Sequence, residues 1–318
     1  ELNFGIDAGF LNNRINFTFD IYTRRNYDLI GATNTMGVGG ETTKYGNVAK
    51  MKSNGVELSL NTVNIKTKDF TWTTDFIYSH MHNEVTELNT LNRLYDYISG
   101  YGFTMPGYPQ RSLFSIPFAG LNNEGLPTFY DPDGNITVTG IDMQEYDPER
   151  LKFLKYEGPA DPTDVGSLGN IFRYKNLTLN LFITYSFGNV VRLDPVFSSE
   201  YSDLTATPKE FNNRWIKPGD EKFTNIPVIA SRQQLNNIAY LSRAYQSYNY
   251  STARVAKGDF IRMKEISLAY EFPKTLTQPL HLSNLSLKLQ ATNLFLLYAD
   301  KKLNGQDPEF FNTGGVAT

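Results

Sequence analysis

Apolar and polar residues alternate along several segments of this 318-residue chain. Successive side chains of a β-strand point to opposite faces, so this pattern predicts strands with one apolar and one polar face. The first segment, 2–10, places an apolar residue at every second position, and the pattern resumes at 15–21. Leu11-Asn12-Asn13-Arg14 lies between the two segments, which predicts a hairpin with a tight turn.

The same pattern predicts three further hairpins, with strands near the length of about 9–11 residues that crosses a bilayer. The predicted pairs are 56–61 with 70–79, 165–174 with 177–184, and 260–272 with 285–291. Within 260–272 the apolar face changes sides near Lys264-Glu265, where we expect a β-bulge.

Long segments join these hairpins, at roughly 27–46, 84–163 and 191–254, and they are rich in Gly, Pro, Asn, Asp and Tyr. Connections of this length are unusual inside a compact domain. Short turns at one end of the strands and long loops at the other are typical of an outer-membrane barrel. The sequence therefore predicts an all-β fold: a transmembrane antiparallel β-barrel, with about eight strands present and long extracellular loops.

Composition agrees with this fold and excludes other classes. Hydrophobic residues make up 40% of the chain, and no window is apolar enough for a spanning helix. The net charge of -3 comes from scattered Lys and Arg residues, so nucleic acid is not an expected partner. Cysteine is absent, which excludes disulfides and Cys-ligated metal in this chain.

Strand direction gives an expectation about completeness. If 11–14 is a periplasmic turn, segment 2–10 descends from the outer face and the last strand, 285–298, ascends to it. We therefore expect at least one strand to be missing at each end, and the first residues show neither an initiator Met nor a signal peptide. An isolated eight-stranded barrel is the alternative.

Alternation also assigns side chains to the two faces of the predicted wall. Residues expected to face lipid are Phe17, Phe19, Leu58, Leu60, Leu179 and Leu181. Residues expected in aromatic girdles near strand ends are Tyr22, Trp72, Tyr78, Tyr185 and Tyr270. Residues expected to line the lumen are Asp7, Asp20, Glu57, Asp75, Lys288 and Gln290. A wet interior tolerates such charges.

Several blocks resemble the C-terminal part of the barrel in the SusC/RagA family of TonB-dependent outer-membrane transporters of Bacteroidetes. These blocks are GIDAGFLNNRIN at 5–16, NGVELSLN at 54–61, FRYKNL at 172–177, RWIKPGD at 214–220, GDFIRMKEISL at 258–268, ATNLF at 291–295 and QDPE at 306–309. Their order and spacing extend over nearly the whole chain.

The resemblance implies that residues 1–318 are the C-terminal part of a 22-stranded barrel, its fourteenth to twenty-first strands. It also implies an N-terminal plug reached by TonB, a SusD-like surface lipoprotein as a lid, and a dimer of barrel-lid pairs in the outer membrane. The chain departs from the family at Gly314-Gly315-Val316-Ala317-Thr318, where a final strand ending in an aromatic residue is expected. It also lacks the plug, the TonB box and a signal peptide.

Motifs that could carry chemistry are weak. His80 and His82 lie two residues apart on one strand face, a spacing that binds metal only with further ligands, so we expect polar wall positions. Segment 131–135, DPDGN, resembles the start of a calcium loop but lacks the late glutamate, and a tight hairpin is the better interpretation. Gly37-Val38-Gly39-Gly40 is expected to be a flexible loop. No spacing indicates catalysis, a metal or a cofactor, so we do not expect an enzyme.

Loop aromatics give the candidate binding residues. Flat rings stack on sugars or peptide side chains, while neighbouring polar groups fix orientation. Aromatic residues make up 14% of the chain. The candidates for substrate or lid contact are Tyr95, Tyr97, Tyr101, Phe103, Tyr108, Trp215, Tyr245 and Tyr248. The alternative is that these rings pack the loops together.

The resemblance implies TonB-driven import of oligomeric nutrients, with oligosaccharide as the first substrate class and oligopeptide as the second. A competing class is a soluble or surface β-protein, such as an adhesin or a polysaccharide-binding module. That alternative needs the Phe and Leu faces buried against a second sheet.

Overall fold

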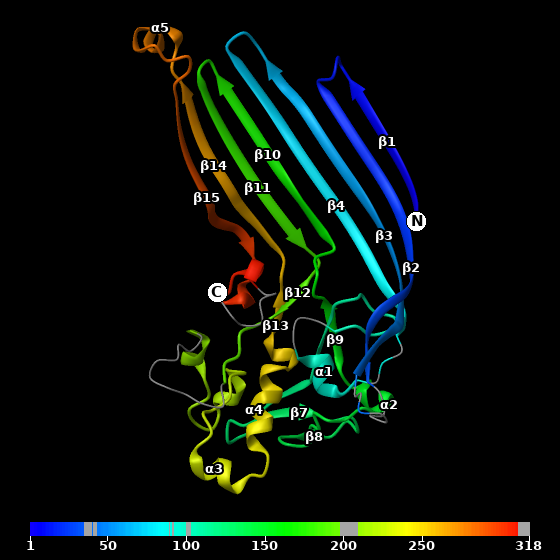
Figure 1. The fold of residues 1–318 in the computed structure, drawn as a ribbon. Coiled ribbons are helices and arrows are strands. Elements are labelled where there is room, and N and C mark those ends of the chain that lie inside the picture. Colours follow the sequence, from blue (N-terminus) through cyan, green and yellow to red (C-terminus); the bar gives the residue numbers. More distant parts are fainter. Residues whose placement is uncertain are drawn as a thin grey trace.

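A computed structural model describes residues 1–34, 40, 43–88, 90, 92–99, 103–197 and 209–310. Its main feature is an eight-stranded antiparallel sheet, with strand order β1-β2-β3-β4-β10-β11-β14-β15 (Figure 1). The bounds of these strands are β1 Leu2–Phe10, β2 Ile15–Asn34, β3 Thr43–Lys66, β4 Phe70–Leu88, β10 Asp164–Tyr174, β11 Leu177–Phe187, β14 Phe260–Glu271 and β15 Ser286–Ala299. All four predicted hairpins are confirmed.

The hairpin turns lie at one end of the sheet and the long loops lie at the other, as Figure 1 shows. Asn12 and Asn13 have φ of 56° and 61°, the left-handed region that asparagine tolerates better than most residues. Lys175, in the turn between β10 and β11, has φ of 50°. The link from β14 to β15 is longer and holds α5 (Lys274–Thr277) and η4 (Gln278–Leu280).

The predicted bulge in β14 is confirmed. Met263 pairs with Ile183 and Glu265 with Phe182, so Lys264 is an extra residue in this strand. The bulge shifts alternation by one position and explains why the apolar face changes sides in the sequence. Both Arg262 and Lys264 then reach Glu309, at 2.8 Å and 3.3 Å.

The predicted connection 27–46 is wrong for most of its length. β2 continues to Asn34 and β3 begins at Thr43, with an irregularity at Asp28, whose φ is 55°. β4 likewise continues to Leu88, five residues into the predicted loop 84–163. Ion pairs support the extension, since Lys52 lies 3.0 Å from Glu84 and Lys50 lies 2.8 Å from Glu87. These strand extensions carry polar residues on both faces, so the alternation of apolar and polar residues does not reveal them.

Cross-strand pairing fixes the two faces of the sheet. Leu60 pairs with Phe17 and Phe76, and Leu58 pairs with Phe19 and Tyr78, so these side chains share one apolar face. On the opposite face Thr18 donates to Asp7 over 2.7 Å, and Asn180 donates to Glu265 over 3.2 Å.

Tyr22 is an exception to the predicted girdle. It lies two residues from Asp20 without an intervening register shift, and it therefore belongs to the polar face. Its ring packs at Gly55, where an added Cβ would meet the Tyr22 hydroxyl oxygen at 2.5 Å. The sequence placed Tyr22 near the end of its strand, where a girdle residue is expected. Its position on the polar face means that it does not contact lipid.

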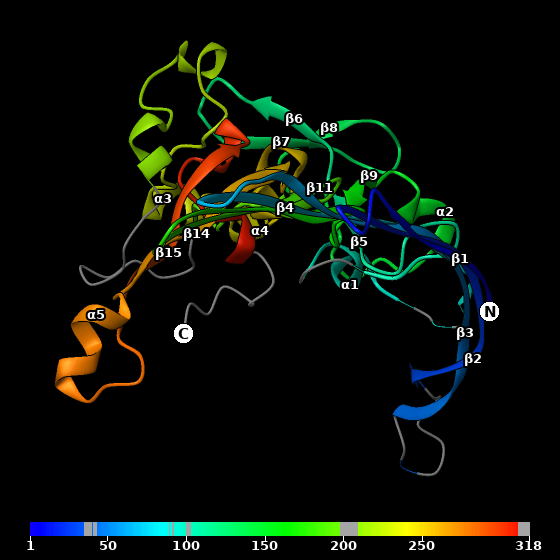
Figure 2. The same ribbon diagram turned by 90° about the horizontal axis from the view of Figure 1, so that it is seen from above.

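Figure 2 shows that the sheet is bent into an arch, with the red segment that follows β15 on its concave side. Arg262 pairs with Thr184 on the polar face and forms a 2.6 Å ion pair with Asp307 of the C-terminal segment. The polar face is therefore the concave one and the apolar face is convex. Such a curved sheet, with β1 and β15 as its edges, is a segment of a barrel wall.

The loop end contains small elements that the alternation did not predict. The strands are β5 (Ser112–Ser115), β6 (Phe118–Leu121), β7 (Pro127–Tyr130), β8 (Ile136–Thr137), β9 (Lys155–Pro159), β12 (Val190–Arg192) and β13 (Val255–Lys257). The α-helices are α1 (Leu94–Ile98), α2 (Pro148–Leu151), α3 (Arg232–Asn237) and α4 (Leu241–Asn249). The 3-10 helices are η1 (Lys209–Asn213), η2 (Asp220–Lys222), η3 (Thr252–Arg254), η5 (Lys301–Leu303) and η6 (Pro308–Phe310).

The segment 131–135 forms the expected hairpin turn. It joins β7 to β8, and Tyr130 pairs with Ile136 across it. The Asp131 carboxylate accepts hydrogen bonds from the backbone N–H groups of Asp133 and Asn135, at 3.0 Å and 2.8 Å. The carboxylate oxygens thus close the turn.

Among the described residues, no helix combines the length and apolar character that crossing a bilayer demands.

Candidate functional site

The long loops pack into one apolar core, which lies below the sheet in Figure 1. Its fully buried members come from distant segments: Leu94 and Ile98 of α1, Phe129 of β7, and Leu241 and Tyr248 of α4. Burying each such side chain contributes about 1.5–3 kcal/mol. The outer end is therefore a folded unit on which a site can be held in place.

Charged side chains join distant segments of the loop end. Arg254 forms a 2.5 Å ion pair with Glu210, and their side chains are 3% and 18% exposed. Arg192, at the end of β12, donates to the backbone oxygen of Phe114 over 2.6 Å. Each charged group has a partner that offsets part of its loss of water, so removing one partner is costly.

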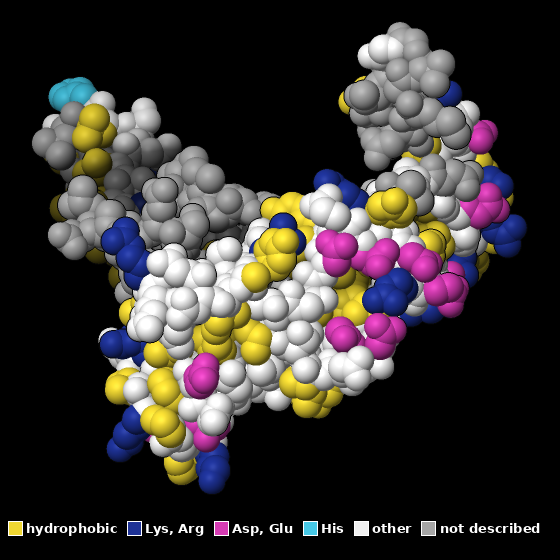
Figure 3. All heavy atoms as spheres, turned by 90° about the horizontal axis from the view of Figure 1, so that it is seen from below, with side chains coloured by type: hydrophobic (Ala, Val, Ile, Leu, Met, Phe, Trp, Pro, Cys, Tyr) yellow, Lys and Arg dark blue, Asp and Glu magenta, His cyan; other side chains and the backbone are white. Residues whose placement is uncertain are grey.

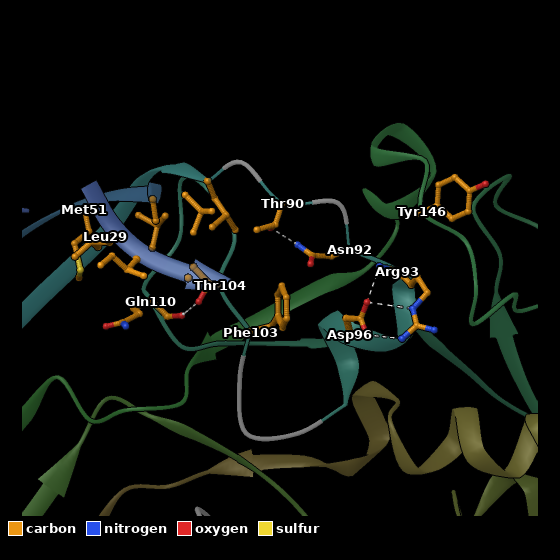
Figure 4. A pocket seen from close by; sticks show the side chains of 16 residues that line it. Leu29, Met51, Thr90, Asn92, Arg93, Asp96, Phe103, Thr104, Gln110 and Tyr146 are labelled. Carbon is orange, nitrogen blue, oxygen red and sulfur yellow. Dashed lines mark hydrogen bonds and ion pairs between the residues drawn. The ribbon is translucent and has the colours of Figure 1, made fainter. Parts of the chain in front are cut away.

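A pocket of about 650 Å³ lies between the extended β2–β4 strands and the loop that carries α1 (Figure 4). Apolar strand residues form one side, and polar side chains with two rings form the other. Its lining is Leu29, Ile30, Gly31, Val48, Ala49, Met51, Val85, Leu88, Thr90, Asn92, Arg93, Asp96, Phe103, Thr104, Gln110 and Tyr146.

Two strand residues of this pocket, Met51 and Val85, belong to the concave face. Met51 is six residues from Glu57, without a register shift between them, so alternation places both on the polar face. Met51 pairs with Val85, which brings Val85 to the same face. A molecule in the pocket would thus lie at the outer end of the lumen side.

Arg93 and Asp96 form the charged part of the pocket. The Arg93 guanidinium lies 3.0 Å from the Asp96 carboxylate, and the Asp96 carboxylate also accepts the Arg93 backbone N–H at 2.9 Å. Burial raises the pKa of Asp96, but the hydrogen bonds from Arg93 outweigh that effect, so the pKa lies below its usual value. Asp96 is therefore ionised at neutral pH, and the pair offers a donor and an acceptor side by side.

Of the predicted binding residues that the structure describes, only Phe103 lines this pocket. Tyr97 packs edge to face on Phe103, with ring centroids 4.9 Å apart, and so supports it from behind. Tyr95 packs edge to face on Tyr250 at 6.0 Å, and Tyr108 packs on Phe114 at 5.2 Å. Tyr95, Tyr97, Phe103 and Tyr108 are half-buried. Tyr101 lies outside the described residues.

Trp215, Tyr245 and Tyr248 are buried, with exposed fractions of 8%, 8% and 1%. The Tyr245 hydroxyl donates to the backbone oxygen of Val228 over 2.6 Å. Tyr248 packs against Phe197 at 5.7 Å between ring centroids. These three rings pack the loops together, the alternative interpretation of the sequence, and their contact with substrate or a lid stays a prediction.

Sequence reasoning missed most of the pocket. Leu29 and Ile30 lie where a loop was expected, Met51 lies outside every predicted strand, and Arg93 and Tyr146 carried no motif. A usable signal was the Arg93–Asp96 spacing of three residues at a helix start, because an acidic side chain at this position accepts the backbone N–H of the residue before the helix. The other polar residues of the pocket are far apart in the sequence, and no sequence pattern indicates that folding brings them together.

His80 is paired within the wall. Its Nδ1 lies 2.8 Å from an Asp164 carboxylate oxygen, which also accepts the Tyr78 hydroxyl at 2.7 Å. His80 pairs with Asp164 directly across the strands, and both lie on the convex face at its outer end. The described residues contain no cluster of three or more His, Cys, Asp or Glu side chains that could hold a metal ion. The Gly37-Val38-Gly39 part of the predicted flexible loop is outside those residues.

Comparison with known proteins gives consistent similarities. No family model matches the chain. Over 332 residues it is 26% identical to the TonB-dependent receptor P3 of Formosa agariphila, covering 97% of this chain and 30% of that protein. Over 325 residues it is 26% identical to the TonB-dependent receptor SusC of Bacteroides thetaiotaomicron, covering 96% of this chain and 29% of that protein. The chain thus spans about a third of the length of these relatives.

Solved structures share the fold. A chain in the structure of the RagAB peptide transporter matches with a TM-score of 0.69 and 24% identity, over 96% of this chain and 32% of that chain. A RagAB peptide importer in its open-open state matches with a TM-score of 0.69 and 22% identity. Nearly the whole chain, loops included, therefore follows an architecture that is already known.

Proposed function

We propose, from the premise that this chain is part of the barrel of a SusC-like TonB-dependent receptor, that the complete protein imports oligomeric nutrients across the outer membrane. One observation carries the proposal: a curved sheet with an apolar convex face, a polar concave face and long loops packed at one end. Such a wall separates lipid from a wet interior. The relatives are receptors and transporters rather than enzymes, which agrees with this role.

The pocket at the outer end of the concave face suits first contact with a nutrient. Phe103 and Tyr146 supply flat rings, and the Arg93–Asp96 pair supplies a donor and an acceptor. Sugars are bound by rings that stack on their faces and by polar groups that read their hydroxyls. Oligosaccharide is therefore the proposed substrate class. Oligopeptide is the alternative, because the RagAB structure is described as a peptide transporter.

Further parts of the proposal lie beyond this chain. We place these strands in a 22-stranded barrel with an N-terminal plug that TonB displaces, and with a SusD-like lipoprotein over the outer mouth. Two such pairs form the proposed assembly. The inner-membrane proton gradient supplies the energy through TonB.

A soluble or surface binding module remains the competing class. It requires the convex Phe and Leu residues to be covered by protein, whereas Leu2, Phe4 and Leu289 are 72%, 60% and 65% exposed here. An exposed apolar face of this kind marks a contact surface, and lipid is the contact that the barrel supplies. Extraction from the native membrane separates the classes, since only the barrel requires detergent.

The test of import is uptake by cells that contain the full protein. Wild-type cells, a deletion strain and cells carrying Asp96→Asn are given labelled oligosaccharides and, separately, labelled oligopeptides. We expect the deletion strain to lose uptake of oligosaccharides, and a protonophore to abolish that uptake in wild-type cells. Asp96→Asn should reduce uptake at low substrate concentration, while Glu149→Gln, on an exposed carboxylate outside the pocket, should not.

Loss of peptide uptake alone would favour the alternative substrate class. Undiminished uptake of both in the deletion strain, or uptake that survives the protonophore, would overturn energy-coupled import.

A further inference from the structure

Two of the sequence blocks that carry the family resemblance, 258–268 and 306–309, meet at the outer end of β14. Arg262 of the first block forms ion pairs with Asp307 at 2.6 Å and with Glu309 at 2.8 Å, both from the second block. The Arg262 side chain is 7% exposed, so losing these carboxylates would leave a sheltered charge without partners. None of the three residues lines the pocket, and the proposed function gives them no role.

These ion pairs hold the segment 300–309, which we call the strap. It follows β15 and lies on the concave side of the sheet (Figure 2). The Gln306 side chain accepts the backbone N–H of Asp194 at 2.9 Å and donates to the backbone oxygen of Arg192 over 3.2 Å. Leu303 is 4% exposed and packs in a small core with side chains of β12 and β13. The strap therefore joins the wall to the β12–β13 pair.

Arg192 continues the connection from the strap to β5. Its guanidinium donates to the backbone oxygen of Phe114 over 2.6 Å and to the Ser115 hydroxyl over 3.3 Å. Burial lowers the pKa of Arg192 to about 10, so the side chain stays charged at neutral pH and relies on these acceptors. A shift of the Arg192 backbone would therefore displace β5 as well.

β5 in turn holds a ring of the pocket. The Phe103 N–H donates to the Ser112 backbone oxygen over 2.7 Å, and the Ser112 N–H donates to the Phe103 oxygen over 2.9 Å. Ser112 is fully buried, and the Phe103 side chain lines the pocket in Figure 4. Tyr97 packs on both Phe103 and Phe114, with ring centroids 4.9 Å and 6.0 Å apart. The position of the Phe103 ring thus depends on the position of β5.

We propose that Arg262 and Gln306 are positioning residues for the pocket. Arg262 fixes the strap to the wall, and Gln306 fixes β12 to the strap. Arg192 and β5 then carry that position to the Phe103 ring. Contiguous hydrogen bonds and packed side chains of this kind can couple distant sites. The inference rests on the proposed function only where it takes the pocket for a substrate site.

The experiment measures amide hydrogen exchange, by mass spectrometry, in the full protein purified in detergent. The variants are Arg262→Met, the conservative Arg262→Lys, Gln306→Met, and the double variant with both methionines. Arg150→Met is the matched control, because Arg150 also pairs with two carboxylates, Glu145 at 2.9 Å and Asp133 at 3.4 Å, while its side chain is 43% exposed. Figure 3 looks onto the loop end and shows acidic and basic side chains side by side on this outer surface. Heat-modifiable migration on gels confirms that each barrel is folded.

We expect Arg262→Met and Gln306→Met each to speed exchange about tenfold or more in 190–197 and 103–115, because local opening of these segments becomes easier. Arg262→Lys should have a smaller effect, since an ammonium reaches two carboxylates less well than a guanidinium does. Arg150→Met should leave both segments unchanged. The double variant should exchange no faster than the faster single variant, because both substitutions release the same strap.

Unchanged exchange of 103–115 in a folded Arg262→Met protein would overturn the inference. So would additive effects in the double variant, because the two residues would then act separately. Equal acceleration in β10 and β11 would also overturn it, since opening of the wall would then be the cause.

Uptake by cells tests the consequence for substrate. Arg262→Met should raise the oligosaccharide concentration that gives half-maximal uptake severalfold and leave the maximal rate unchanged, while Arg150→Met should change neither. A fall in the maximal rate alone would contradict a positioning role. Normal uptake in the deletion strain would instead remove the proposed function, and the exchange rates, which need no substrate, would still decide whether the strap positions Phe103.

Discussion

Replacing Leu60 by arginine tests whether the convex face contacts lipid. Leu60 lies five residues from Ile65, which pairs with the girdle residue Trp72. A strand that rises about 3.3 Å per residue and tilts by about 40° climbs about 2.5 Å in height per residue. Leu60 therefore stands about 13 Å above the girdle, near the middle of an apolar band about 25 Å tall.

Arginine on the lipid face at the bilayer midplane costs about 2–4 kcal/mol, which is roughly a 30- to 900-fold change in the unfolding equilibrium. Ser59→Arg is the matched control, because Ser59 is the next residue of β3 and its pairing with Thr18 and Ile77 places it on the concave face. We expect Ser59→Arg to change stability by no more than about 0.5 kcal/mol.

The assay is urea unfolding of the full protein in phospholipid vesicles, followed by tryptophan fluorescence and by migration of unheated samples on gels. Equal costs for the two variants, or a larger cost at Ser59, would refute the assignment of faces. Equal small costs would also favour the soluble alternative, in which neither face contacts lipid.

Three other predictions concern the loop core. Arg254→Met should destabilise the loops by an amount near the lower end of about 3–5 kcal/mol, because it removes the ion-pair partner of Glu210, which has little access to solvent. The control Lys52→Met, at an exposed pair with Glu84, should cost less than about 1 kcal/mol. Equal rates of limited proteolysis in the two variants would contradict this prediction. Burial raises the pKa of Tyr248 to about 12, against about 10 in an unfolded chain, so the neutral phenol contributes stability that is fully present below pH 10 and is lost as pH rises through 12. Proteolysis of the loops should accelerate over that range, and Tyr248→Phe should reduce the acceleration; an identical pH profile in this variant would show that Tyr248 is not the cause. Gly125→Ala should cost about 1–3 kcal/mol, because a φ of 76° strains alanine and the added Cβ meets the Trp215 ring. Gly134→Ala should cost less, because its φ of 82° is similar but the space around it is open. A lower melting temperature for Gly134→Ala than for Gly125→Ala would contradict the steric argument.

The wall could be predicted from the sequence because each strand is half-exposed to an apolar medium. Alternation in 2–10 and 15–21 implied the hairpin, and the shift of parity near Lys264 implied the bulge that the pairing of Met263 with Ile183 confirms. Each residue of such a strand lies on one face or the other, so its polarity must match the medium that this face contacts.

The pocket could not be predicted in this way. Its strand side comes from the parts of β2, β3 and β4 that rise beyond the lipid band, where both faces meet water or protein and alternation disappears. Its other side comes from α1 and its neighbours, which are brought there by burial of Leu94 and Ile98 in the loop core.

The aromatic candidates show the same limit. Composition identified Trp215, Tyr245 and Tyr248 as notable, but only packing shows that these rings are buried, while Phe103 lines a pocket.

By itself the sequence determined the four hairpins of the wall, the two faces of most of their alternating segments and the family resemblance, because these follow from contacts that are local along the chain or repeated in each strand. Tertiary structure alone decided which loop residues meet, which charges lose water and which rings stay accessible. Those outcomes depend on contacts between segments far apart in the sequence, as between Glu210 and Arg254 or Gly125 and Trp215, and no periodic pattern records them.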